Sequence, residues 1–175
     1  MKVILSMVSS VDGKITKWEH GNAYNWNSQG DRKHFDALVV KANLIVMGST
    51  TYDVIRPKAK KGVLRIVMTS KPARYSGQEV AGQLEFTSED PRSLVARLAK
   101  KGYKELLLVG GGGLNSTFFK AGLVDEFWLT IEPKIFGKGK MIVDDTPLDV
   151  NLQLETFKKL NLDGTLLLKY KPKKS

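Results

Sequence analysis

Four consecutive glycines at positions 110–113 constrain the fold of this chain more than any other feature of its sequence. They follow an apolar run at 106–109 and precede a helical pattern at 114–121. Glycine lets the backbone approach a ligand closely, and the start of a helix offers free N–H groups to an anion. A tight turn needs only one or two glycines, and four cost chain entropy. The junction therefore predicts a phosphate-binding turn for a nucleotide. We expect valine at Gly111 or Gly112 to abolish nucleotide binding while the domain still folds.

The two best-known nucleotide motifs do not fit this turn. The G-x-G-x-x-G motif opens a βαβ unit and is followed about 20 residues later by an acidic residue, whereas these glycines come late in the chain. The P-loop motif needs Gly-Lys-Ser or Gly-Lys-Thr, and the sequence contains neither. The predicted phosphate site therefore belongs to another α/β fold.

Composition narrows the class of protein. The 175 residues suit one domain spanning 1–175, and the absence of cysteine excludes disulfides and thiolate metal sites. His20 and His34 have no metal-ligand spacing with nearby acids, so no metal is expected. The net charge of +10 is spread along the chain without an aromatic platform or a helix-turn-helix pattern, which argues against nucleic acid. With no signal peptide and no apolar run of bilayer length, we expect a cytoplasmic protein without a membrane partner.

The hydrophobic periodicity predicts an α/β fold. Strand patterns at 2–8, 44–47, 63–68 and 105–109 alternate with helical patterns at 30–42, 93–101 and 114–121, and a short helix follows Gly48. A longer strand pattern at 125–135 precedes two strands, 152–160 and 165–170, that form a hairpin. Residues 11–27 and the segment before 93 are interpreted as loops. The prediction is a mostly parallel sheet with helices on both faces and an antiparallel C-terminal hairpin.

Small and hydroxyl-bearing residues follow four of the predicted strands, at 9–12, 48–51, 69–71 and 110–115. Ligands of open α/β sheets bind beyond the carboxyl ends of the strands. The sequence therefore predicts one binding site where these four clusters meet.

In the same order, the clusters resemble the dihydrofolate reductase superfamily. The N-terminal half carries Trp26-Asn27, then Asp31, then Phe35, then a Met-Gly-x-x-Thr strand end at 47–51, and Leu129-Thr130 occurs in a later strand. The C-terminal half is more similar to the reductase domain of the riboflavin-biosynthesis deaminase-reductases. The matching segments are Ser-Val-Asp-Gly-Lys-Ile at 10–15, Gly-Gly-Gly-Leu-Asn at 111–115, Gly-Leu-Val-Asp-Glu at 122–126 and 133–139.

This resemblance implies a three-layer αβα fold, a homodimer and an NADPH-dependent reductase acting on a pyrimidine-like or pteridine-like small molecule. It implies that Asp31 orients and protonates the substrate ring, and that the substrate contacts Ser9, Asp12, Trp26, Phe35 and Thr130. The implied cofactor residues are Gly48, Ser49, Thr50, Thr51, Thr69, Ser70, Lys71, Gly110, Gly111, Gly112, Gly113, Leu114 and Asn115.

Three departures from the family patterns bear on substrate and cofactor. Gly110 stands where the riboflavin-type reductases usually have Glu, and Val63 stands where dihydrofolate reductases have an Arg for the folate tail. Ser49 replaces a common basic residue, so Lys71 or Arg74 is expected to hold the 2′-phosphate of NADPH. An aminopyrimidine of riboflavin biosynthesis is the expected substrate. Dihydrofolate reductase and a non-catalytic nucleotide-binding or RNA-binding module are the alternatives.

Overall fold

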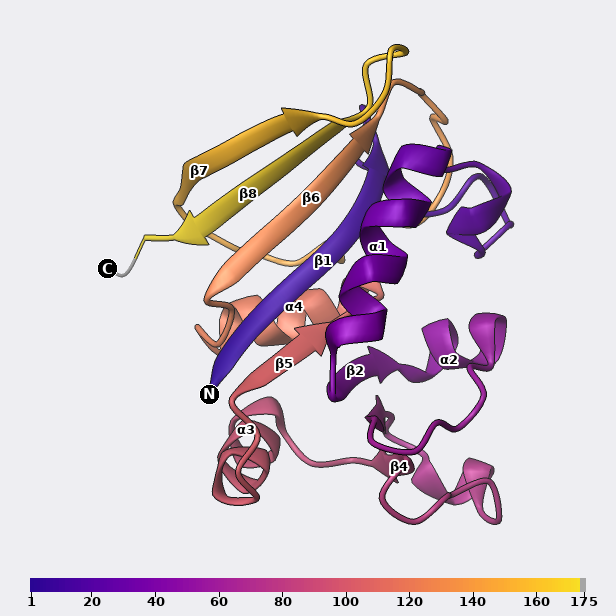
Figure 1. Ribbon diagram of the computed structural model, residues 1–175, viewed down its shortest axis with the longest axis vertical. Coiled ribbons are helices and arrows are strands. Elements are labelled where there is room, and N and C mark those ends of the chain that lie inside the picture. Colours follow the sequence, from indigo (N-terminus) through magenta and orange to yellow (C-terminus); the bar gives the residue numbers. More distant parts are fainter. Residues whose placement is uncertain (174–175) are drawn as a thin grey trace.

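The computed structural model describes residues 1–173 and contains one sheet of eight strands in the order β4-β3-β2-β5-β1-β6-β8-β7 (Figure 1). The strands are β1 (Lys2–Ser10), β2 (Leu44–Gly48), β3 (Leu64–Met68), β4 (Leu84–Thr87), β5 (Glu105–Leu108), β6 (Glu126–Glu132), β7 (Leu152–Lys159) and β8 (Leu166–Pro172). From β4 through β6 all neighbours are parallel, whereas β8 is antiparallel to both β6 and β7.

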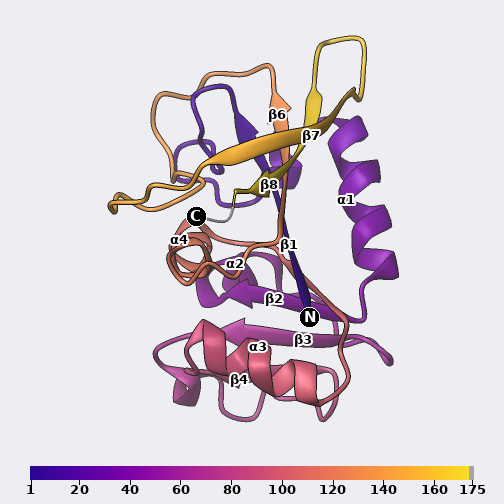
Figure 2. The same ribbon diagram turned by 90° about the vertical axis from the view of Figure 1, so that its left-hand side faces the viewer.

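Helices cover both faces of this sheet. They are α1 (Gln29–Lys41), α2 (Ser49–Ile55), α3 (Pro91–Lys100) and α4 (Gly112–Lys120), with short 3-10 helices at Ala23–Asn25 and Pro72–Tyr75. Figure 2 shows α1 on one side of the strands and α4 on the other. The predicted three-layer fold, mostly parallel with a C-terminal hairpin, is confirmed.

Alternation along the strands builds two cores, one for each face. In β1, Val3 and Leu5 pack with Leu94 and Leu98 of α3 and with Phe118 of α4. Ile4, between them, points to the opposite face, where the core contains Ile45, Met47, Val67 and the rings of Tyr52, Tyr75 and Phe86. The central strands are therefore buried on both faces, as their continuous apolar runs predict.

Helix α1 begins as the sequence predicts but is buried differently. The Ser28 side chain caps it by accepting from the Asp31 N–H at 3.2 Å. Its apolar stripe, Phe35, Leu38 and Val39, is only half-buried, and the one fully buried residue of the helix is Asp31. An acidic residue therefore takes the most enclosed position of an otherwise shallowly packed helix.

Strand β4 lies in a segment whose sequence predicts a loop, and this part of the prediction was wrong. Its four residues, Leu84–Thr87, alternate between buried and half-buried positions and pair with β3 at the edge of the sheet. Because the strand is so short, its two apolar residues give little periodic signal. Its addition brings another strand end to the predicted binding edge.

Candidate active site

A cleft of about 1310 Å³ opens at the carboxyl ends of the parallel strands. Its floor contains Met7 and Val8 of β1, Gly48 at the end of β2, Met68 before Thr69 and Val109 after β5. Residues 15–24 and α1 form one wall, and the segment 138–145 contributes to another. The cleft lies where parallel α/β sheets bind their ligands.

Most of the predicted site residues meet in this cleft. Those that line it are Asp31, Phe35, Gly48, Ser49, Thr50, Thr51, Thr69, Ser70, Gly111, Gly112, Gly113 and Leu114. They come from α1, from the starts of α2 and α4, and from the residues that follow β3. The convergence of separate strand ends was predicted from the sequence, and the structure shows it.

The remaining predicted residues are placed outside the cleft lining. Ser9, Trp26, Thr130 and Asn115 are buried, and Gly110 lies behind the glycine turn, where its carbonyl accepts from the Gly48 N–H at 2.8 Å. Lys71 is exposed on the surface. Trp26 packs edge-on against Phe136 at 5.1 Å between ring centroids. These residues do not line the cleft, and their contacts with substrate or cofactor stay predictions.

Asp31 is the buried carboxyl group of the cleft, with 4% of its surface exposed. Its Oδ2 accepts a hydrogen bond from Asn27 Nδ2 at 2.7 Å. Burial raises the pKa of Asp31, and the carboxylates of Glu132 and Asp36 raise it further, against opposing hydrogen bonds from Thr130 and Asn27. A carboxyl group in these surroundings keeps its proton to a higher pH than an exposed one and suits proton donation.

The pKa of Asp12 is shifted in the opposite direction to that of Asp31. Its carboxylate accepts from the Ser10 hydroxyl at 2.6 Å and from the N–H groups of Phe136 and Gly137 at 3.1 and 2.8 Å. The Ser10 hydroxyl, with help from these N–H groups, lowers the pKa of Asp12 to about 2. Both oxygens are occupied by the protein, so Asp12 joins two loops and is unsuited to donate a proton near neutral pH.

The four glycines differ in what surrounds them. At Gly110, whose φ is +82°, an added Cβ would lie 2.8 Å from Met7 Sδ. At Gly112 it would lie 2.5 Å from the Met141 carbonyl oxygen, and at Gly113 2.8 Å from Asp144 Oδ2. These three positions are small because other parts of the protein pack against them. A side chain at Gly112 would have to displace the segment at 141–144, which argues against the expectation that Gly112→Val leaves the fold intact.

Gly111 is the glycine that faces open cleft. Its φ of −78° is accessible to any residue, and an added Cβ would meet only Thr51 Oγ1 at 3.5 Å and Ile15 Cδ1 at 3.9 Å. It precedes the first turn of α4, and the N–H groups of a first helical turn can donate to an anion. This position fits the close approach of a phosphate group.

The segment 141–144 is fastened to the start of α4. Asn115 Nδ2 donates to the Ile142 carbonyl at 2.7 Å, and the Asp144 N–H donates to Ser116 Oγ at 2.8 Å. The Asp144 carboxylate consequently lies beside the first turn of α4 and lines the cleft. No motif or period in the sequence marks Asp144 as a site residue.

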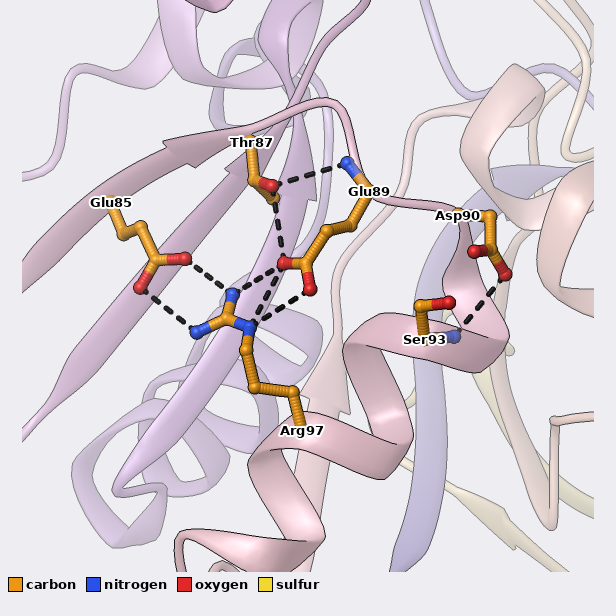
Figure 3. Close-up of polar contacts among 6 residues, drawn as sticks. All are labelled: Glu85, Thr87, Glu89, Asp90, Ser93 and Arg97. Atoms are coloured by element: carbon orange, nitrogen blue, oxygen red, sulfur yellow. Dashed lines mark hydrogen bonds and ion pairs between the residues drawn. The ribbon is translucent and has the colours of Figure 1, made fainter.

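Two more acidic residues that line the cleft, Glu89 and Asp90, come just after β4. Arg97 of α3 bridges Glu85 on β4 and Glu89 just beyond it, with its Nη2 2.6 Å from Glu89 Oε2 (Figure 3). Arg97 lowers the pKa of Glu89. Asp90 caps α3 by accepting from the N–H groups of Arg92 and Ser93. These contacts fix residues 87–91, which line the cleft beside Thr69 and Ser70.

The cleft is more acidic than the protein as a whole. Among the described residues that line it, the carboxylates are those of Glu19, Asp31, Glu89, Asp90, Asp144 and Asp145, and the basic side chains are Lys138 and Lys140. Arg74, expected near the nucleotide, instead forms an ion pair with Asp53 at 3.3 Å. An anion in this cleft would therefore be held mainly by N–H groups and hydroxyls.

Two negative findings concern the described part of the chain, residues 1–173. No group of three or more His, Asp or Glu side chains is arranged to hold a metal ion there. Nor is any helix in that range long and apolar enough to cross a membrane.

The structure is a three-layer α/β domain with a cleft at the carboxyl ends of its parallel strands, and comparison with known families identifies which family of such domains it belongs to. Residues 1–166 match the RibD C-terminal domain. The chain belongs to this family, and it shares the fold of the dihydrofolate reductase superfamily.

Similar proteins are known from Bacillus subtilis. The uncharacterized protein YwjB is 29% identical over 174 residues, covering 94% of this chain and 90% of YwjB. The uncharacterized protein YyaP is 27% identical over 163 residues, covering 87% and 86%. The riboflavin biosynthesis protein RibD of Actinobacillus pleuropneumoniae is more distant, at 23% identity, and the match covers 95% of this chain but 54% of that protein.

Solved structures confirm the fold. A putative riboflavin biosynthesis protein from Shewanella sp. PV-4 superposes with a TM-score of 0.79 at 22% identity, covering 99% of this chain and all of the other. Dihydrofolate reductase from Enterococcus faecalis, complexed with NADP(H), superposes with a TM-score of 0.67 at 17% identity, covering 99% and 97%.

Proposed function

We propose that this protein is an NADPH-dependent reductase that transfers a hydride to a pyrimidine-like or pteridine-like small molecule. The observation that carries the proposal is the presence, in one cleft, of a buried carboxyl group with a raised pKa and of an open glycine at a helix start. A reduction of a C=N bond needs a hydride donor and a proton donor side by side, and this cleft has room for both.

The residues of the cleft fit a dinucleotide. Gly111 and the first turn of α4 would hold the diphosphate, and Gly48 with Thr51 at the start of α2 would hold it from the other side. Thr69 and Ser70 would bind the adenosine-side phosphate through their hydroxyls. The reduced nicotinamide supplies the hydride when bound. The protein positions both reactants and holds the proton on Asp31.

The expected substrate is an aminopyrimidine of the kind reduced in riboflavin biosynthesis, 5-amino-6-(5-phosphoribosylamino)uracil. Membership of the RibD C-terminal domain family supports this class of ring. Val63, where a dihydrofolate reductase would carry an Arg, is buried in the core and offers no charge to a folate tail. Dihydrofolate remains the second candidate because the chain superposes on a dihydrofolate reductase over nearly its whole length.

Two measurements test the proposal. Calorimetric titration with NADPH and NADH should show binding in the submillimolar range, tighter for NADPH. Oxidation of NADPH should then be followed with the aminopyrimidine, with its dephosphorylated form and with dihydrofolate. If neither nucleotide binds, the protein is not a reductase of this kind. Equal binding of both contradicts only recognition of the 2′-phosphate, and turnover of dihydrofolate alone would reverse the order of the substrates.

A further inference from the structure

Glu132, the last residue of β6, is a carboxylate with only 1% of its surface exposed, and it does not line the cleft. Its Oε1 accepts from the Ser28 N–H at 2.7 Å, and its Oε2 accepts from the Thr165 hydroxyl at 2.8 Å. Both oxygens of this carboxylate therefore accept hydrogen bonds from the protein. Burying such a group against neutral donors is costly to the fold, which suggests a role outside stability.

The contacts of Glu132 join three elements at the start of α1. Ser28 is the N-cap of α1, and its hydroxyl accepts from the Asp31 N–H. Thr165 lies in the turn between β7 and β8, where Asn161 Nδ2 donates to its hydroxyl at 2.8 Å. The same turn packs closely on α1, because a Cβ at Gly30 would lie 3.1 Å from the Leu160 carbonyl oxygen. Glu132 therefore fixes the first turn of α1, which carries Asp31, to the sheet and to the hairpin.

We propose that Glu132 is a positioning residue for Asp31, which it serves by clamping the first turn of α1 and by adding its own buried carboxylate to the surroundings of the Asp31 carboxyl group. This inference rests on the proposed function, in which Asp31 donates its proton to the substrate. The clamp sets where the Asp31 carboxyl group points, and the charge makes loss of its proton less favourable.

The groups around Asp31 support this role for Glu132. From α1 itself come Asp36 and Arg32, from β6 come Thr130 and Glu132, and from the preceding segment comes Asn27. Arg32 donates to Asn27 Oδ1 at 2.9 Å and to the Tyr24 carbonyl at 2.6 Å. Asp36 is exposed and accepts from the Tyr24 hydroxyl. Glu132 is buried, whereas Asp36 is exposed. A charge acts more strongly on its neighbours through a low-dielectric interior than through water.

The substitution Glu132→Gln separates the charge from the clamp, because the amide oxygen can still accept from the Ser28 N–H. Asp36→Asn is the matched control, since it removes an exposed carboxylate from the same helix. Titration of the Asp31 carboxyl carbon by NMR, on the protein without ligands, is the readout. In Glu132→Gln we expect Asp31 to titrate roughly one pH unit lower, the usual effect of one nearby charge, and in Asp36→Asn we expect a smaller shift.

A matching change is expected in catalysis. An acid that must be protonated loses activity as the pH rises through its pKa, so the falling limb of the kcat/KM profile should move down with the titration. The activity of Glu132→Gln above this limb should fall about tenfold, as a displacement of one pH unit requires. An unchanged Asp31 titration in folded Glu132→Gln would overturn the proposal, since a merely structural glutamate would not move it.

Two further outcomes are distinguishable. Should Glu132→Gln fail to fold, Glu132→Asp decides, because it keeps the charge and shortens the clamp. It should leave the Asp31 titration in place and speed hydrogen exchange at the Ser28 amide, and unchanged exchange would overturn the proposal. Because the titration needs no substrate, a wild-type protein without reductase activity counts against the proposed function and leaves the result on Glu132 standing.

Discussion

Asp31 shows at the scale of one residue how the site is built at the expense of stability. It is the fully buried residue of α1, in a position that an apolar side chain would fill without cost. Burial and the neighbouring carboxylates act against its ionised form. Such a residue makes sense where a carboxyl group is used in chemistry and is hard to explain as packing.

Replacing Asp31 by Asn keeps the size of the side chain and removes the proton. Turnover should fall by roughly two to four orders of magnitude, the usual contribution of a general acid. NADPH affinity should hardly change, because the predicted nucleotide contacts lie elsewhere in the cleft. The deficit should shrink at low pH, where solvent can supply the proton. Full turnover of the mutant across the pH range would leave Asp31 as a helix-start carboxylate.

The same substitution should stabilise the folded protein at neutral pH. The folded-state pKa of Asp31 is raised above its ordinary value of 3.8, so the folded protein holds this proton more tightly than the unfolded chain. Stability therefore falls as the pH rises through the folded pKa, and Asp31→Asn escapes that loss. The gain should be about 0.5–2 kcal/mol at pH 7, the range usual for relieving one unfavourable feature, and should vanish toward pH 3.8. Thermal unfolding at several pH values measures it, and a mutant less stable at pH 7 would contradict it.

Gly111 and Gly112 should behave differently when each is replaced by Ala. At Gly111 the methyl group projects into the cleft without a clash, so the protein should keep its stability and bind NADPH at least about tenfold more weakly, the result of roughly 1.4 kcal/mol of steric cost. At Gly112 the methyl group would meet the Met141 carbonyl oxygen, and the overpacking should cost about 1–3 kcal/mol of stability. Calorimetry and urea unfolding on both variants separate the two effects. Unimpaired NADPH binding by Gly111→Ala would remove the glycine turn from the proposed site.

At the scale of elements, one wall of the cleft depends on two loops that hold each other. Asp12 accepts from the N–H groups of Phe136 and Gly137, the Lys140 N–H donates to Thr16 Oγ1 at 2.8 Å, and the Ile142 N–H donates to the Gly13 carbonyl at 3.2 Å. Neither loop contains a long helix or strand. Each loop is held in place by these hydrogen bonds to the other loop.

Asp12→Asn should therefore loosen this wall. Because the pKa of Asp12 is lowered from 3.8 to about 2, its stabilising contacts are fully present above pH 3.8 and are lost as the pH falls toward 2. Hydrogen exchange at the Phe136 and Gly137 amides should be faster in the mutant at neutral pH. Glu19→Gln is the control, because it removes an exposed ion pair with Lys138 that joins the same two loops. Equal exchange in the mutant and the wild-type protein would show that Asp12 does not hold the loops.

The elements that could be predicted from the sequence are those with a clear hydrophobic periodicity or a local motif. The central strands, the start of α1 at Ser28 and the meeting of strand ends at Gly48, Thr69 and Gly111 all follow from local pattern. Strand β4 is too short to show a period, so its contribution at 87–91 was missed. The segment 133–151 has no period at all. The position of Asp144 against α4 depends on tertiary packing that only the complete fold determines.

Over the whole chain the net charge is positive, whereas the lining of the cleft is acidic. The chain carries a net charge of +10, yet carboxylates outnumber basic groups among the described residues that line the cleft. A positive overall field can raise the rate at which an anionic cofactor arrives, while N–H groups and hydroxyls determine how it is held. The basic composition is therefore compatible with a nucleotide-dependent enzyme and does not require a nucleic acid.

The C-terminal hairpin carries the surface on which we expect a second copy of the chain to pack. All of β7 is exposed at the edge of the sheet, and its pairing with β8 puts Leu152, Leu154 and Phe157 opposite Pro172, Tyr170 and Leu168, on one face. Phe157 is 71% exposed, an unusual state for an aromatic ring beside an open strand edge.

The wild-type protein should sediment at twice its chain mass of 19.5 kDa, and Phe157→Glu should sediment as a monomer because it buries a charge at the contact. Leu162→Glu is the control, since Leu162 is 95% exposed in the hairpin turn, away from that face. A monomeric wild-type protein, or a Phe157→Glu variant that still dimerises, would show that this face is not the interface.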